Sequence, residues 1–182
     1  MGDRVSRPKQ TIKPLQPVLK PVMAEQSSSE PAPSTVIVIM GASGDLAKKK
    51  IYPTLWRVAK GGLFPKNTKI VGYARSDLTI EKLKEKCAPF LKATDEEADK
   101  LKDFWARNTY VRGSYTEKQA FDALSAEIKK QETGFKKANR LFYLALPPSV
   151  FAPVTSNIKL CCMSPCGWSR VIVEKPFGKG LS

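Results

Sequence analysis

The 182-residue sequence contains no histidine. Histidine is the side chain that most often removes a proton from a hydroxyl group near neutral pH, so the commonest general base is absent. A lysine or a carboxylate takes that role only after a large shift of its pKa. The pattern Y-x-x-x-K, which supplies the tyrosine and lysine of the short-chain dehydrogenases, is absent as well. The sequence therefore lacks the usual groups for deprotonating an alcohol.

Long apolar runs are also lacking. No stretch approaches the roughly 20 consecutive apolar residues of a membrane-spanning helix, and the N-terminus has no apolar core of a secretory signal. We therefore expect no membrane association and a cytoplasmic location. An organellar transit segment is the alternative, because acidic residues are few near the N-terminus, but only Arg4 and Arg7 supply arginine there.

Two further patterns are missing. Three of the four cysteines lie in "CCMSPC" (161–166), which is unlike the paired C-x-x-C arms of a zinc site, so we expect reduced thiols and no metal. The P-loop pattern G-x-x-x-x-G-K-[ST] does not occur either.

Basic residues, in contrast, are abundant. Lysine and arginine number 31 against 17 acidic residues, which gives a net charge of +14 and a field that attracts phosphates, nucleotides or nucleic acid. The basic residues are spread along the chain and form no nucleic-acid recognition motif, so we expect no nucleic-acid partner.

Residues 1–33 differ in composition from the rest. They hold six of the 14 prolines, a run of three serines and no aromatic residue. Such a segment buries too little apolar surface to offset the entropy of ordering. We predict a disordered tail over 1–33 and one folded domain over 34–182.

From residue 35 onward, short β-branched or aromatic runs alternate with amphipathic stretches. The predicted strands span 35–40, 69–74, 109–114, 140–146 and 170–174. Their nearly continuous apolar character indicates burial on both faces of a sheet. This order predicts a doubly wound parallel α/β domain, with the carboxyl ends of all strands at the ligand-binding edge.

Helix signals lie between the strands. Capping residues predict helices that begin at Thr79, at Thr94 and at Thr116, the last two with capping boxes closed by a glutamate or glutamine three residues later. Pro89 should break or kink the first of these. Two more helices are expected, one ending in a left-handed cap at 61–62 and one over about 148–162.

The stretch "GASGDLA" (41–47) follows the first strand and precedes a helix. Gly41 permits a tight turn, Gly44 lets the backbone approach a pyrophosphate, and Ala47 suits close helix–strand packing. Free N–H groups and the helix dipole then face an anion. The pattern alone also fits a plain strand-to-helix turn. The following lysines fit either a solvated helix face or a source of positive potential.

The second strand ends in "VGYARS". A dinucleotide site places an acidic residue here for a ribose hydroxyl, or an arginine for a 2′-phosphate. Arg75 therefore favours the phosphorylated cofactor, with Ser76 and Asp77 just beyond it. The separation from Gly41, 75 − 41 = 34 residues, exceeds the usual spacing of about 20. An ordinary exposed arginine is the alternative.

The fifth strand ends in "VEKPFG" (173–178). Lys175 lies at the ligand edge, where it could bind a phosphate or a sugar hydroxyl. The bond before Pro176 is a candidate for the cis form, which is usually kept for tight functional turns. A strand-ending turn with an exposed lysine is the alternative.

Taken together and in order, five stretches resemble the N-terminal coenzyme domain of the glucose-6-phosphate 1-dehydrogenase family. The resemblance runs from about Val36 to Gly178 and rests on "GASGDLAKKKIYPTLW", "VGYARS", "FWARNTYVRGSY", "NRLFYLALPP" and "GWSRVIVEKPFG". It implies a Rossmann-like NADP-binding domain.

The family oxidises D-glucose 6-phosphate at C1 to 6-phosphogluconolactone and reduces NADP⁺. The resemblance implies that Arg75 takes the 2′-phosphate of NADP, and that Lys175 contacts both cofactor and sugar phosphate and is positioned by Pro176. It also implies a cofactor-binding stretch made of Gly41, Ala42, Ser43, Gly44, Asp45, Leu46, Ala47 and Lys48.

Residues 145–147 should line the nicotinamide side. Phe151 stands where the family has a tyrosine near the cofactor, so one hydroxyl contact should be lost.

The family continues into a larger α+β domain with the segment "RIDHYLGK", the substrate phosphate site and the catalytic histidine, none of which this sequence contains. We therefore expect a truncated product without turnover of its own. A coenzyme domain built to pack on a second domain should also leave an apolar face uncovered. The family is homo-oligomeric, so the alternative is a non-catalytic NADP-binding fragment that associates with full-length subunits.

Overall fold

A computed structural model describes residues 31–175. Its core is a five-stranded, fully parallel sheet in the order β3-β2-β1-β4-β5. The strands are β1 (Ser34–Met40), β2 (Asn67–Ala74), β3 (Asn108–Arg112), β4 (Ala138–Leu144) and β5 (Ser169–Val173). All five predicted strands are confirmed, and the predicted doubly wound α/β fold is confirmed with them.

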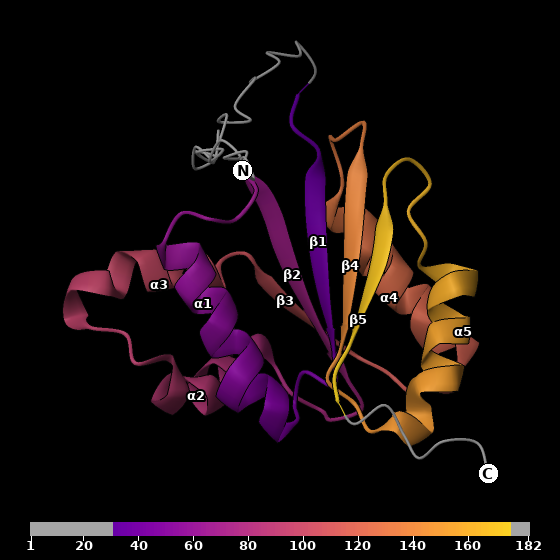
Figure 1. The fold of residues 1–182 in the computed structure, drawn as a ribbon, viewed down its shortest axis with the longest axis horizontal. Coiled ribbons are helices and arrows are strands. Elements are labelled where there is room, and N and C mark those ends of the chain that lie inside the picture. The colour runs from indigo at the N-terminus through magenta and orange to yellow at the C-terminus, as the bar shows by residue number, and fades with distance from the viewer. Residues whose placement is uncertain (1–30, 176–182) are drawn as a thin grey trace, which may run out of the picture. The chain divides into compact units, whose positions relative to one another are not determined.

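Helices lie on both faces of this sheet. The helical elements are η1 (Ala47–Ile51), α1 (Tyr52–Lys60), α2 (Ile80–Leu91), η2 (Asp95–Glu97), α3 (Ala98–Trp105), α4 (Lys118–Gln131), η3 (Pro148–Val150) and α5 (Phe151–Cys161). α1, α2 and α3 cover one face, and α4 and α5 cover the other (Figure 1). The carboxyl ends of the strands meet at the lower edge in this view.

Strand β1 holds the two layers together because all seven of its residues are buried. Val36, Val38 and Met40 pack with the α4–α5 layer. Ile37 and Ile39 pack with the α1–α3 layer. Successive side chains of β1 thus pack into two different cores, one on each face of the sheet. This explains why its sequence is continuously apolar and does not alternate between apolar and polar residues.

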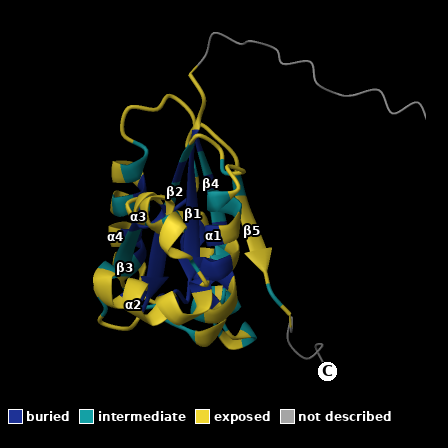
Figure 2. Ribbon diagram, turned by 90° about the vertical axis from the view of Figure 1, so that its left-hand side faces the viewer, coloured by how far each residue is buried: buried dark blue, intermediate teal, exposed yellow. Residues whose placement is uncertain are grey.

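Strand β5 departs from the predicted burial on both faces. Figure 2 shows it standing at the exposed margin of the sheet. Val171, Ile172 and Val173 remain 45%, 39% and 39% exposed. Within residues 31–175 this strand pairs only with β4. Its apolar composition is that of a covered strand, although no described element covers it.

The first residues of the helices confirm part of the predicted capping. The Thr79 hydroxyl accepts a hydrogen bond from the Lys82 N–H (3.3 Å), as expected for an N-cap. The capping box predicted at Thr116 is wrong: α4 follows Glu117 without a side-chain cap, and the Thr116 hydroxyl pairs with that of Ser114 (3.2 Å).

Two other helix predictions are corrected in detail. Pro89 does not break α2, which continues to Leu91, because only one N–H in the last turn is lost. The capping box predicted at Thr94 is confirmed, with the Glu97 carboxylate accepting from the Thr94 N–H (3.2 Å), but the helix begins there as the short η2 and continues as α3 to Trp105.

The cap after α1 is left-handed at Gly62 (φ +69°), as predicted, while the preceding glycine is not (φ −79°). The tail predicted over residues 1–33 and the cis bond before Pro176 lie largely outside the described residues. Within residues 31–175, no helix is long and apolar enough to cross a membrane.

Candidate functional site

The glycine turn is fixed between β1 and β2. The N–H groups of Gly41 and Ala42 donate to the Tyr73 carbonyl (2.8 and 3.1 Å). Gly41 has φ +88°, and a Cβ there would lie 2.9 Å from Leu146 Cδ2 and nearer still to the Ala145 carbonyl oxygen. Only glycine therefore fits this position.

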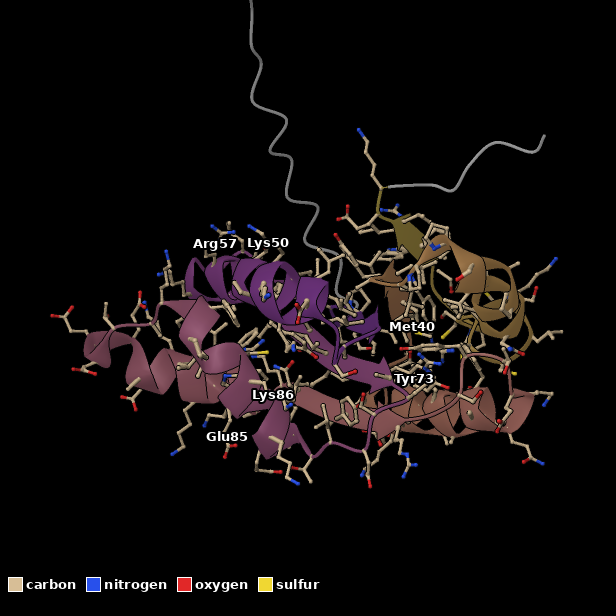
Figure 3. All side chains as sticks on the ribbon, turned by 90° about the horizontal axis from the view of Figure 1, so that it is seen from below. Met40, Lys50, Arg57, Tyr73, Glu85 and Lys86 are labelled. Carbon is tan, nitrogen blue, oxygen red and sulfur yellow. The ribbon has the colours of Figure 1, made fainter. Side chains whose placement is uncertain are left out.

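The turn leads directly into a helix. The Gly44 N–H donates to the Gly41 carbonyl (2.9 Å), and the Lys48 N–H donates to the Gly44 carbonyl (3.1 Å). The first helical N–H groups then point toward the edge where the strands end, which is the geometry that binds anions. Figure 3 looks onto this edge, with Met40 and Tyr73 near its centre.

The lysines after the turn divide between two places. Lys48 and Lys49 lie 3.1 and 2.9 Å from the Asp45 carboxylate, and they lower the pKa of Asp45, Lys49 more than Lys48. Lys50 lies on the outer side of η1 (Figure 3). It lines a hollow beside β5. The Asp45 carboxylate therefore partly neutralises the positive potential predicted for this run of lysines.

Arg75 lies where β2 ends, beside the glycine turn. Its guanidinium stacks 5.3 Å from the centre of the Tyr115 ring, a cation–π contact. Burial raises the pKa of Tyr115, and Arg75 opposes that rise. The Ser43 hydroxyl meets the Ser76 hydroxyl at 2.9 Å, which ties the turn to the segment after β2.

These groups enclose one pocket of about 220 Å³. Its walls are Gly41, Ser43, Gly44, Arg75, Ser76, Tyr115, Ala145, Leu146, Pro147 and Val150. No carboxylate is among these lining residues, because Asp77 turns away to Arg112 (3.5 Å). Arg75 also lines an adjoining hollow that contains Glu117, but inside the pocket itself the guanidinium meets no carboxylate, which suits a phosphate better than a ribose hydroxyl.

Other predicted site residues stand back from this pocket. Ala42 and Ala47 are buried in the core beneath the turn. Leu46, 39% exposed, lines the hollow beside β5. Phe151 is half-buried against the α4–α5 core. Lys175 is exposed at the end of the described chain, after β5.

A sequence model of the family described as "Glucose-6-phosphate dehydrogenase, NAD binding domain" matches residues 38–182. The chain belongs to the glucose-6-phosphate dehydrogenase family. The resemblance seen in the sequence is thereby confirmed, and the glycine turn and Arg75 pocket fall inside the matched segment.

Relatives agree with this assignment. Glucose-6-phosphate 1-dehydrogenase of Drosophila melanogaster is 57% identical over 142 residues, which cover 78% of this chain and 27% of the relative. Glucose-6-phosphate 1-dehydrogenase 2 of Mus musculus is 49% identical over 164 residues, covering 90% of this chain and 32% of the relative. The chain thus spans about a third or less of these relatives.

A solved glucose-6-phosphate dehydrogenase in complex with its substrate glucose-6-phosphate superimposes with a TM-score of 0.76 at 42% identity. The match covers 83% of this chain and 32% of that one. The Rossmann-like fold of the family is therefore shared across the described domain.

Two features of the site were missed in the sequence. Tyr115 forms a wall of the pocket, and its signal was an aromatic residue directly after the third predicted strand. The Tyr143 hydroxyl donates to the Glu174 carboxylate, which joins β4 to the segment carrying Lys175. No sequence signal paired these two residues. Among the described residues no group of side chains could hold a metal ion.

Proposed function

We propose that this chain is the NADP-binding portion of a glucose-6-phosphate 1-dehydrogenase. The observation that carries the proposal is the single pocket shared by the Gly41 turn and the Arg75 guanidinium. The turn and first helical N–H groups would hold the pyrophosphate, and Arg75 would hold the 2′-phosphate. When bound, the nicotinamide of NADP⁺ supplies a hydride acceptor.

The activity proposed for the complete protein is the oxidation of D-glucose 6-phosphate at C1 to 6-phosphogluconolactone, with formation of NADPH. Lys175, at the ligand edge after β5, would contact both the cofactor and the sugar phosphate. The Tyr143–Glu174 hydrogen bond supports this role, because it holds the preceding residue against β4. The 182 residues themselves contain no histidine, so we propose that they bind NADP⁺ without turning over substrate.

Exposed β5 supports the proposal that activity needs further polypeptide. A hollow of about 450 Å³ beside β5 is lined mainly by apolar residues. An apolar strand and hollow of this kind are typical of a surface that another domain covers. The same surface favours a second candidate function, association of this chain with complete homo-oligomeric subunits. Co-expression with the complete enzyme, followed by sizing of mixed oligomers, tests that candidate; no mixed species would refute it.

We propose that the folded domain is divided from the preceding segment between residues 33 and 34. Limited proteolysis tests this boundary through the size of the fragment that resists digestion.

We also propose a cytoplasmic location. The four cysteines, all free, support it because reducing compartments keep thiols unpaired. Cell fractionation tests the location.

Cofactor preference is the sharpest test of the proposed function. Calorimetric titration of the chain should give tighter binding of NADP⁺ than of NAD⁺. Arg75→Ala should weaken NADP⁺ binding about tenfold or more, since a charge-assisted contact is lost, and should leave NAD⁺ binding unchanged. Arg57→Ala, on the exposed outer face of α1 (Figure 3), is the matched control. Equal losses for both cofactors would contradict the assignment of Arg75.

A further inference from the structure

A second basic site lies at the opposite edge of the sheet, where the strands begin. A hollow of about 540 Å³ opens between the end of α1, the loop before β2, and α3. Its walls are Ala59, Lys60, Gly61, Gly62, Phe64, Lys66, Lys100, Asp103, Phe104 and Arg107. Figure 1 shows α3 beside the end of α1, far from the edge with the glycine turn. The hollow is thus separate from the cofactor pocket, and its volume is that of a small-molecule site.

The hollow continues into a smaller one of about 250 Å³ through two shared cations, Lys66 and Arg107. The second hollow adds Lys69 and the exposed ring of Phe135. Together they form a groove, the amino-edge groove, whose two hollows each combine basic side chains with a phenylalanine.

Charge in this groove is strongly unbalanced. Lys60 is paired with the Glu97 carboxylate (2.9 Å). Lys66 and Arg107 have neither a hydrogen-bonded side-chain partner nor an ion-pair partner within residues 31–175. Lys100 makes no such contact either, but the pKa of Glu97 is lowered by Lys60 and, less strongly, by Lys100. Unpaired cations around one hollow attract an anion of more than one charge.

The floor of the groove is apolar. Phe104 is buried at 1% exposure, and Phe64 is half-buried beside it. Among the residues that line the larger hollow, Asp103 is the only acidic one, and its exposed carboxylate is available as an acceptor for a hydroxyl or amine. The groove therefore offers three chemistries to one ligand: cations, an apolar floor and one acceptor.

We propose that the amino-edge groove binds an organic polyphosphate, a small molecule in which a chain of phosphates is joined to a ring. Lys66, Lys100 and Arg107 hold the phosphate chain, and the ring lies on Phe64, the half-buried phenylalanine of the larger hollow. A hollow of this volume fits a small ligand better than a nucleic-acid strand, which needs a continuous basic track.

The test uses the full chain carrying Arg75→Ala, so that the cofactor pocket is weakened. Inorganic tripolyphosphate and ATP are titrated separately by calorimetry at low and high salt. Both should bind, ATP more tightly because of its ring, and both more weakly at high salt. Absence of binding, or ATP binding no more tightly than tripolyphosphate, would overturn the proposal.

Variants locate the binding. Lys66→Gln with Arg107→Gln should weaken tripolyphosphate about tenfold or more. Lys66→Gln with Lys100→Gln changes only exposed side chains, so it keeps the test valid if the first pair unfolds the chain. The matched control is Lys130→Gln with Lys159→Gln, exposed lysines of α4 and α5. Equal weakening in the control would show binding to net charge alone and refute the groove.

Discussion

Replacing Gly41 by alanine tests whether the turn is built around a missing side chain. Gly41 has φ +88°, which costs a non-glycine residue about 1–2 kcal/mol. Its new Cβ would also meet the Ala145 carbonyl and Leu146 Cδ2, and a backbone carbonyl cannot move away by changing rotamer. Overpacking of this kind costs a further 1–3 kcal/mol or so. We therefore expect a loss of about 2–5 kcal/mol in the free energy of unfolding.

Gly134 provides the matched control. It has nearly the same dihedral, φ +90°, but an added Cβ there meets nothing within 4 Å. Gly134→Ala should therefore show the dihedral cost alone, about 1–2 kcal/mol, and should bind NADP⁺ as the unaltered chain does.

Urea unfolding measures both variants, with the fluorescence of buried Trp56 and Trp105 as the signal. Calorimetry then gives NADP⁺ affinity, which should fall about tenfold or more only in Gly41→Ala, since the turn at Gly41 sets the direction of the first helical N–H groups that would hold the phosphate. The reasoning is refuted if both variants lose the same stability, or if Gly41→Ala binds NADP⁺ normally.

Four further predictions concern stability and thiol chemistry. Glu132→Ala leaves the Arg140 guanidinium, 1% exposed, without its two-point carboxylate partner (2.6 and 2.7 Å) and should cost about 3–5 kcal/mol by urea unfolding. Adding Arg140→Met should recover only part of this loss, because the Cys162 and Met163 carbonyls then lose the donor at 2.8 and 2.9 Å. Thr79→Ala should cost about 1 kcal/mol through the lost cap of α2, and a loss near zero by the same assay would contradict that cap. A thiol reagent should label exposed Cys166 rapidly and buried Cys162 only after unfolding. Burial raises the pKa of Cys162 from 9.0 to about 12, so the thiol of the unfolded chain loses its proton at lower pH than that of the folded chain. The free energy of unfolding should therefore fall as pH rises above about 9. In Cys162→Ala this fall should be less steep.

Local signals in the sequence were sufficient for the sheet. Each predicted strand remains a strand. Burial on both faces explains the apolar composition of β1 and of the end of β2, whereas β5 has a similar composition at an exposed margin of the sheet. Caps were less predictable. Thr79 caps its helix, whereas Thr116 pairs with Ser114 in the tertiary structure and leaves α4 uncapped by a side chain.

The site likewise has features that the sequence predicts and contacts that only the structure shows. The sequence by itself determined the Gly41 turn and the placement of Arg75 at the next strand end, since chain direction in a parallel sheet brings both to one edge. Only the tertiary structure decided that Tyr115 stacks on Arg75 and that the Ser43 hydroxyl meets that of Ser76. Those contacts depend on distances between elements, which no local pattern encodes. The amino-edge groove has the same origin: its lysines are scattered in sequence, and the packing of α1 on α3 gathers them.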